Sequence, residues 1–243
     1  MILAAGRGTR LGPLGVHTPK ILIEVGGEPL LARHLRFLER EGVRRVVLNA
    51  HHCVDQLRNF IESYHGAVDL TMLVERALLG TAGGVRNALP HLGAGPFLVL
   101  YGDVLVEEPL APLYEAHLRR GARATLAVFD ARSTLGKGVV ALQDDWRVVS
   151  FAEKKQEGPG LVNAGLYVLD RELVAALPAG VPVDFGHDVF PAALTRGDAI
   201  AAYRLSHAVL DIGTPEALEL ARKLHGRSPA PTTSPGRLDY AGG

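Results

Sequence analysis

The first residues that could do chemistry lie in the stretch LAAGRGTRL, residues 3–11, which contains two glycines and two arginines behind a short apolar run. The backbone N–H groups of a glycine loop can surround an anion, and Arg7 and Arg10 add positive charge. Leu11 stands where a dinucleotide-binding loop needs its third glycine, and a Walker loop would need Gly-Lys-Ser/Thr after four residues. We therefore expect another kind of anion-binding loop, and the alternative is a strand-to-helix turn with solvated arginines.

Two aspartates follow apolar segments much further along the chain. Asp103 comes after the run FLVLYG, and Asp211 comes after AVL. Because ligands of parallel α/β sheets bind at the carboxyl ends of the strands, both carboxylates can face one site. Carboxylate oxygens from two strands suit Mg²⁺, which takes its remaining ligands from water and phosphate. Each aspartate taken alone could instead cap a loop at a strand end.

The elements that must position these residues follow from hydrophobic periodicity. Helical spacing and extended patterns alternate over the first 131 residues. This alternation predicts an α/β fold with right-handed crossovers and a doubly wound, mostly parallel Rossmann-like sheet. Three later extended segments lack long helices between them and predict a small antiparallel layer. The expected helices are 29–42, 54–66, 83–92, 111–121 and, last, 215–226. The expected strands are 44–50, 68–75, 97–103 and 124–131, with 138–142, 147–154 and 163–170 in the added layer.

Composition limits the class of protein and its partners. A chain of 243 residues with 47% hydrophobic content can bury one large core. Lysine plus arginine equals aspartate plus glutamate at 26 each, so no overall field favours nucleic acid or membrane, and we expect a small-molecule partner. The single cysteine, Cys53, excludes an internal disulfide and a multi-cysteine metal site. Without a recognisable signal peptide or membrane-length apolar run, we expect a cytoplasmic protein.

The motifs taken together resemble the sugar-1-phosphate nucleotidyltransferases. LAAGRGTRLGPLGVHTPK has the residue types and gap lengths of that family's opening signature, and GTAGGVRNAL, YGDVL, FAEKK, NAGLYVLD and DIGTPEAL follow in the family's order. The resemblance covers residues 1–226 and implies one catalytic domain with the nucleotide-diphospho-sugar transferase fold. Residues 227–243 have no apolar period, so we expect a disordered tail there.

The resemblance also implies an activity. It predicts an enzyme that uses Mg²⁺ to form an NDP-sugar and pyrophosphate from a nucleoside triphosphate and a sugar 1-phosphate, as a monomer or small homo-oligomer. The motifs are most similar to those of members that transfer a guanylyl group to mannose or heptose 1-phosphate. Uridylyl or thymidylyl transfer to another sugar 1-phosphate stays open, as does an inactive nucleotide-sugar-binding regulatory subunit.

The roles of individual residues are carried over from the family's motifs. The catalytic group would be Arg10, Lys20, Asp103 and Asp211, with the two aspartates holding the metal. The triphosphate would lie on Leu3, Ala4, Ala5, Gly6, Arg7, Gly8 and Thr9, and the base would lie near Glu75, Gly80 and Thr81. The sugar phosphate would meet Gly138, Glu153, Lys154 and Asn163; a solvated strand end with surface lysines is the alternative for the pair 153–154.

Overall fold

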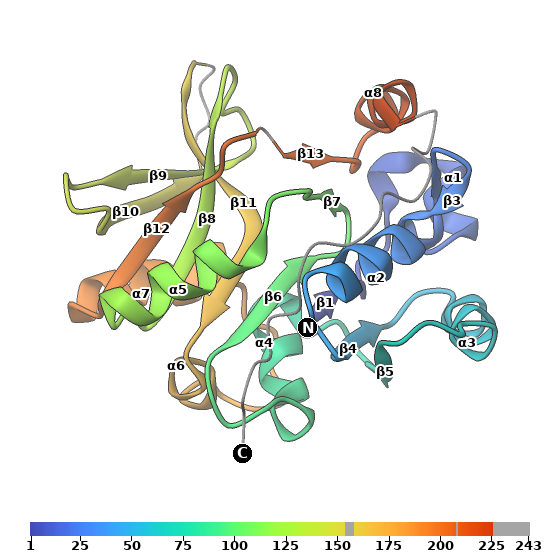
Figure 1. Cartoon of the computed structure of the whole chain (residues 1–243), viewed down its shortest axis with the longest axis horizontal. Coiled ribbons are helices and arrows are strands. Elements are labelled where there is room, and N and C mark those ends of the chain that lie inside the picture. The colour runs from blue at the N-terminus through green and yellow to red at the C-terminus, as the bar shows by residue number, and fades with distance from the viewer. Residues whose placement is uncertain (154–157, 208, 226–243) are drawn as a thin grey trace.

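A mixed nine-stranded sheet forms the centre of the fold (Figure 1). The computed structural model describes residues 1–153, 158–207 and 209–225. Four neighbouring strands are parallel, and their order places the first strand in the interior of the sheet, as the doubly wound prediction requires. These strands are β5 (Asp69–Val74), β4 (Arg45–Ala50), β1 (Ile2–Leu3) and β6 (Phe97–Tyr101), in that order across the sheet.

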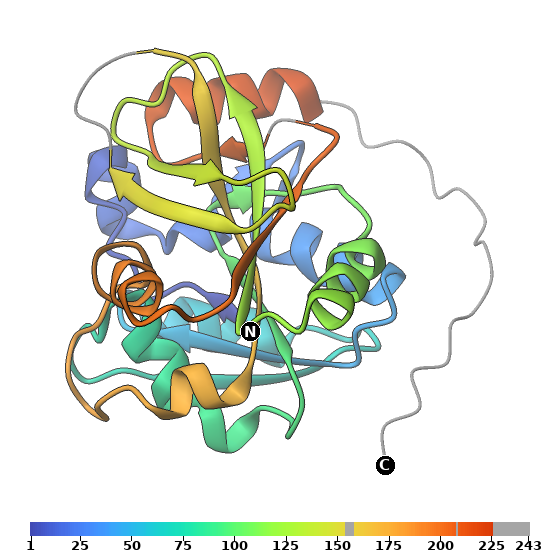
Figure 2. The ribbon, with the colours of Figure 1, turned by 90° about the vertical axis from the view of Figure 1, so that its left-hand side faces the viewer.

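The other half of the sheet is organised around β11 (Gly160–Leu169), which runs antiparallel to β6 and to β8 (Ala124–Ala131). Beyond β8 lies β12 (Ile200–Arg204), parallel to it. The first half of β11 also meets the antiparallel hairpin of β9 (Gly138–Leu142) and β10 (Val148–Glu153), seen face-on in Figure 2. The expected antiparallel layer is therefore present, but β11 leaves it and enters the main sheet.

A change of register allows β11 to serve both layers. Its pairing with β8 shifts between Asn163 and Tyr167, and Gly165 between them has a φ of +70°. Residues with a side chain rarely adopt this conformation, so a glycine permits the bulge at this position.

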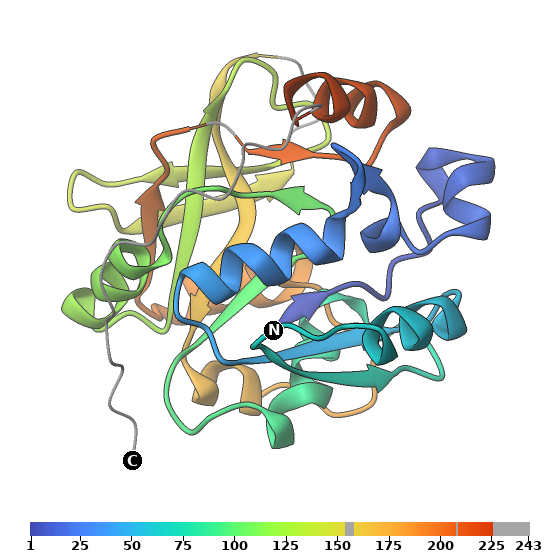
Figure 3. The ribbon, with the colours of Figure 1, turned by 45° about the vertical axis from the view of Figure 1, so that its right-hand side comes forward.

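Helices cover both faces of the sheet because neighbouring strand residues point to opposite sides. Leu100 belongs to a buried cluster on one face that also includes residues of α2 (Leu30–Arg40), α3 (Val54–Glu62) and α5 (Leu110–Arg120). Figure 3 shows α2 lying across this face. Val99, one residue earlier on β6, packs on the other face. The helices there are α4 (Gly80–Ala88), α6 (Arg171–Ala175) and α7 (Phe190–Arg196), together with the π-helical turn η4 (Phe185–Val189).

A smaller third cluster joins the two ends of the described chain. It contains α8 (Pro215–His225) and the ribbon of β2 (Glu24–Val25) and β3 (Glu28–Pro29). A second two-stranded ribbon pairs β7 (Val104–Leu105) with β13 (Leu210–Asp211). Three short helical segments, η1 (Thr9–Leu11), α1 (Pro13–His17) and η2 (Lys20–Leu22), follow β1, and η3 (Leu89–His91) follows α4. None of the helices in the described ranges is long and apolar enough to cross a membrane.

Candidate active site

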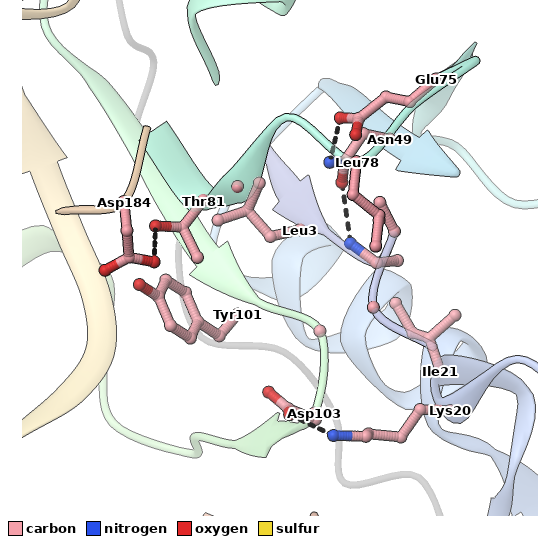
Figure 4. A pocket seen from close by; sticks show the side chains of 15 residues that line it. Leu3, Lys20, Ile21, Asn49, Glu75, Leu78, Thr81, Tyr101, Asp103 and Asp184 are labelled. Carbon is pink, nitrogen blue, oxygen red and sulfur yellow. Dashed lines mark hydrogen bonds and ion pairs between the residues drawn. The ribbon is translucent and has the colours of Figure 1, made fainter. Parts of the chain in front are cut away.

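The carboxyl ends of β1, β4 and β6 meet at one edge of the sheet, where connections leave in opposite directions and a crevice opens. A cavity of about 350 Å³ occupies this edge (Figure 4). Most of the predicted triphosphate and base residues line it. The lining consists of Leu3, Ala4, Ala5, Gly6, Lys20, Ile21, Asn49, Glu75, Leu78, Gly80, Thr81, Tyr101, Gly102, Asp103 and Asp184.

The loop after β1 is held by a buried polar pair. The backbone N–H of Ala4 donates to Asn49 Oδ1 at 2.8 Å, and Asn49 Nδ2 donates to Glu75 Oε1 at 2.7 Å. The other carboxylate oxygen of Glu75 accepts the Leu79 N–H at 3.2 Å, and only 4% of the residue is exposed. Glu75 therefore supports the loop, whether or not it also contacts a base.

Glycine brings α4 against this pair. A Cβ at Gly84 would stand 2.8 Å from both Asn49 Nδ2 and Glu75 Oε1. Real Cβ atoms are not found that close to such atoms, so the helix can approach only with a glycine at this position. The predicted residues Gly80 and Thr81 begin this helix and face the cavity.

An ion pair lies at the mouth of the cavity. Lys20 Nζ is 2.7 Å from Asp103 Oδ2, and the two side chains are 15% and 24% exposed. The β7–β13 ribbon adds the second predicted aspartate, because Asp211 pairs with Val104, the residue after Asp103. The backbone N–H of Ile212 also donates to the Asp103 carbonyl at 2.9 Å. Two residues that lie far apart in the sequence thus come side by side.

Arg10 completes this charged group. Asp211 Oδ1 accepts the Gly213 N–H at 2.7 Å, and a Cβ at Gly213 would stand 2.7 Å from that oxygen and 3.0 Å from Arg10 Nη2. Partial removal from water raises the pKa of Asp211, and the Asp103 charge raises it further, against the opposing influence of Gly213, Lys20 and Arg10. The four predicted catalytic residues therefore share one electrostatic environment.

The rest of the glycine loop lies beyond the cavity lining. Gly8 has a φ of +65°, and a Cβ at Gly15 would stand 2.0 Å from its carbonyl oxygen, so the loop folds tightly onto α1. Arg7 and Thr9 are exposed beside it.

Among the predicted sugar residues that the structure describes, Gly138 and Glu153 lie on the hairpin and Asn163 lies on β11. Gly138 and Asn163 are outside the cavity lining. Gly138 pairs with Glu153 across β9 and β10. Lys154 and the side chain of Glu153 lie outside the described residues. Asn163 binds within the protein, because its Nδ2 donates to the Tyr167 hydroxyl at 2.6 Å and its Oδ1 accepts the Gly165 N–H at 3.1 Å.

Three polar residues in the lining were not foreseen: Asn49, Tyr101 and Asp184. Asn49 and Tyr101 carried the same signal as Asp103, a polar group at or near the end of an apolar run. Asp184 opens the stretch DFGHDVFP, whose likeness to the family's motifs assigned it no role, and its place in the cavity depends on a tertiary contact with Thr81. Burial raises the pKa of Tyr101 to about 12, with its neighbours Tyr167 and Thr81 hydrogen-bonded to it.

The sequence of residues 1–226 matches the family model described as nucleotidyl transferase. The chain belongs to this family. The match covers the whole described region, including the glycine loop and both aspartates.

Individual relatives and solved structures that are similar to this chain have more specific names. Mannose-1-phosphate guanylyltransferase of Mycobacterium tuberculosis is 32% identical over 219 residues, which are 89% of this chain and 61% of the relative. UTP–glucose-1-phosphate uridylyltransferase of Synechocystis sp. is 29% identical over 231 residues, 88% of this chain and 59% of the relative. The chain thus spans about three fifths of the length of these curated relatives. The crystal structure of HddC from Yersinia pseudotuberculosis complexed with GMP-PN has a TM-score of 0.81 and 27% identity, covering 92% of this chain and 97% of that one.

Nucleotidyltransferases of this kind generally use a divalent metal. The residues of this chain fit one: hard carboxylate oxygens come from the turn between β6 and β7 and from β13. The Asp103 charge raises the pKa of Asp211, as expected for carboxylates close enough to share a cation. One oxygen of each carboxylate is engaged by the protein, by Lys20 and by Gly213.

Proposed function

We propose that residues 1–226 form a catalytic domain that transfers a guanylyl group from GTP to a mannose- or heptose-type sugar 1-phosphate and releases pyrophosphate. The observation that carries the proposal is the Lys20–Asp103 ion pair, with Asp211 and Arg10 beside it at the mouth of a glycine-lined cavity. Nucleotidyl transfer must bring two polyanions together, so neutralising charge is its central requirement.

The chemistry needs cations more than it needs a base. The oxygen of a sugar phosphate that attacks the α-phosphorus is already anionic near neutral pH, since the second pKa of a phosphate monoester is about 6. Arg10 and the N–H groups of the glycine loop would hold the triphosphate, and Lys20 would contact the phosphate oxygens at the reacting centre. Asp103 and Asp211 would hold Mg²⁺, which when bound neutralises the charge that develops on the leaving pyrophosphate.

The guanine and sugar assignments rest on the relatives. The Mycobacterium relative is named as a mannose-1-phosphate guanylyltransferase, and the HddC structure contains GMP-PN. UTP with glucose 1-phosphate is the second candidate, because the Synechocystis relative is named for it. Gly138, Glu153, Lys154 and Asn163 remain the residues that we propose for the sugar side.

A pyrophosphate-release screen tests the proposal. ATP, CTP, GTP, UTP and dTTP would each be paired with mannose, heptose and glucose 1-phosphates in the presence of Mg²⁺. We expect the highest kcat/KM with GTP and a mannose or heptose substrate, and loss of turnover in Lys20→Met. Lys223→Met on the surface of α8 is the matched control. Nucleotide binding without pyrophosphate release from any pair would support the regulatory-subunit alternative.

A further inference from the structure

The cavity has a third polar corner, of which the triphosphate and base assignments include Thr81 alone. Figure 4 shows Asp184, Thr81 and Tyr101 on the side away from the Asn49–Glu75 pair and from Lys20–Asp103. Asp184 comes from the segment before η4, more than a hundred residues after Thr81. The corner therefore exists only in the folded chain.

The carboxylate of Asp184 is held in a fixed orientation. Its Oδ2 accepts the Thr81 hydroxyl at 2.7 Å, and its Oδ1 accepts the N–H groups of Gly186 at 2.8 Å and His187 at 3.2 Å. A group fixed in this way loses little side-chain entropy when it accepts a further hydrogen bond.

The charge of this corner decides which ligand atoms suit it. Within the described residues, Asp184 forms no ion pair with lysine or arginine, whereas Asp103 at the cavity mouth is paired with Lys20. An ionised carboxylate accepts hydrogen bonds only and repels phosphate. Burial keeps the neighbouring Tyr101 protonated, with a pKa of about 12. Such a corner suits a neutral ligand group that donates hydrogen bonds, such as a hydroxyl.

Packing places the corner next to the proposed sugar hairpin. The ring of Phe151 on β10 lies between two glycines: a Cβ at Gly138 would stand 2.6 Å from it, and a Cβ at Gly186 would stand 3.1 Å from it. Gly186 is also a hydrogen-bond donor to Asp184. The segment that carries Asp184 is thus packed directly on the hairpin proposed for the sugar phosphate.

We propose that Asp184 accepts a hydrogen bond from one ring hydroxyl of the sugar 1-phosphate and so determines sugar specificity, with Thr81 and Tyr101 shaping the subsite. The proposal rests on the proposed function and deepens it. It predicts preference for a sugar that carries this hydroxyl over the analogue without it, and rejection of a sugar with a carboxylate at that position.

The test compares variants on a matched substrate panel: the best sugar 1-phosphate and each of its monodeoxy analogues, with the nucleotide saturating. Asp184→Ser keeps a side chain that can cap η4 but shortens the reach into the cavity. Asp184→Asn keeps the shape and removes the charge. Asp188→Asn is the control, because Asp188 Oδ2 accepts the Asp184 N–H at 2.7 Å yet lies exposed outside the cavity lining.

For the wild type, we expect kcat/KM for one monodeoxy analogue to be about 10- to 100-fold below that of the parent sugar, the effect of one hydrogen bond to a charged group. In Asp184→Ser, the parent should fall to the level of that analogue, with the KM for the nucleotide within about twofold of wild type. Asp184→Asn should reduce the ratio of kcat/KM between the parent sugar and that analogue. Asp188→Asn should keep the wild-type ratio.

Two results would overturn the assignment of Asp184. One is an Asp184→Ser enzyme that loses activity equally on the parent and on all deoxy analogues, which would indicate a structural role. The other is a wild type that turns over but discriminates against no deoxy analogue. A wild type that releases pyrophosphate from no substrate pair would instead refute the proposed function, and this assignment with it.

Discussion

Lys20 and Asp103 meet across 83 residues of sequence, and each neutralises the other without a ligand bound. Asp211 adds a second negative charge and Arg10 a second positive one nearby. A site with this balance of charges can hold a dication beside its carboxylates and a polyanion beside its cations. The effect of removing any one of these groups should therefore appear in turnover more than in folding.

Arg10 offers the most direct test at the residue scale. Arg10→Ala should keep the fold, because the side chain is exposed, and should lower kcat by roughly two to three orders of magnitude, the scale for one preorganised charge-stabilising group. Steady-state kinetics and a melting curve measure both quantities. Arg119→Ala, on the surface of α5, is the control. Near-normal turnover in Arg10→Ala would indicate that the stretch GRGTR is an ordinary strand-to-helix turn.

Asp103 and Asp211 should behave as one unit. Asp103→Asn and Asp211→Asn should each abolish most turnover and raise the Mg²⁺ concentration for half activity, and the double variant should be little worse than the poorer single one. Asp211→Asn should leave the melting temperature unchanged or raise it, because a like-charge repulsion is removed. Losses that multiply, with an unchanged Mg²⁺ requirement, would contradict a shared metal.

Asp103 and Asp211 could be predicted from the sequence because each follows an apolar run, and Lys20 because it ends the motif LAAGRGTRLGPLGVHTPK. The structure brings the three residues together, although Lys20 lies on the short helix η2 and Asp211 on the separate β7–β13 ribbon. Asp184 could not be found in this way, since its position depends on the packing of η4 against α4 and β10.

At the scale of elements, α4 should respond sharply to one added methyl group. Gly84→Ala would place a Cβ 2.8 Å from Asn49 Nδ2 and Glu75 Oε1, so the pair that holds the Ala4 N–H must shift. We expect a loss of about 1–3 kcal/mol in the free energy of unfolding and a higher KM for the nucleotide. Gly93→Ala, which meets no atom within 4 Å, is the matched control, and equal behaviour of the two variants would refute the argument.

The elements themselves were largely predictable. The segments 124–131 and 138–142 are the observed strands β8 and β9, and residues 29–42 contain α2. The helix expected over 83–92 begins earlier, at Gly80, and ends in the 3-10 turn η3. The insertion of β11 into the main sheet had no local signal, because strand order depends on long-range pairing and periodicity does not encode it.

For the whole molecule, the buried His34 on α2 makes stability depend on pH. Burial lowers its pKa to about 4, although its Nε2 lies 3.2 Å from the Gly102 carbonyl oxygen. In the unfolded chain, a histidine binds a proton with a pKa of about 6.5. Between about pH 6.5 and 4 the unfolded state therefore binds more protons, and the free energy of unfolding should fall as pH falls, by up to about 1.4 kcal/mol per unit.

Denaturant unfolding at pH 7 and pH 5 measures this dependence. His34→Gln keeps a side-chain amide that can donate to Gly102 and removes the titrating ring. The loss in the free energy of unfolding between pH 7 and pH 5 should therefore be smaller in this variant. It should not vanish, because burial also lowers the pKa of His117. An unchanged loss in His34→Gln would assign the dependence to other groups.

The last prediction concerns residues 227–243, which lie outside the part of the chain that the structure describes. Deleting residues 228–243 should leave turnover and the melting temperature unchanged, because that segment offers too little apolar surface to dock. Measurement of both on the shortened chain tests this. Loss of soluble expression would contradict the division at residue 226.

The β7–β13 ribbon has a consequence for the time at which the site is completed during synthesis. A ribosome that has translated the chain through Arg204 has delivered all nine strands of the large sheet, together with Lys20 and Asp103. Asp211 has not yet been added at that moment. A nascent chain can thus build its framework before it has both carboxylates, and the last short strand turns a folded framework into a complete site.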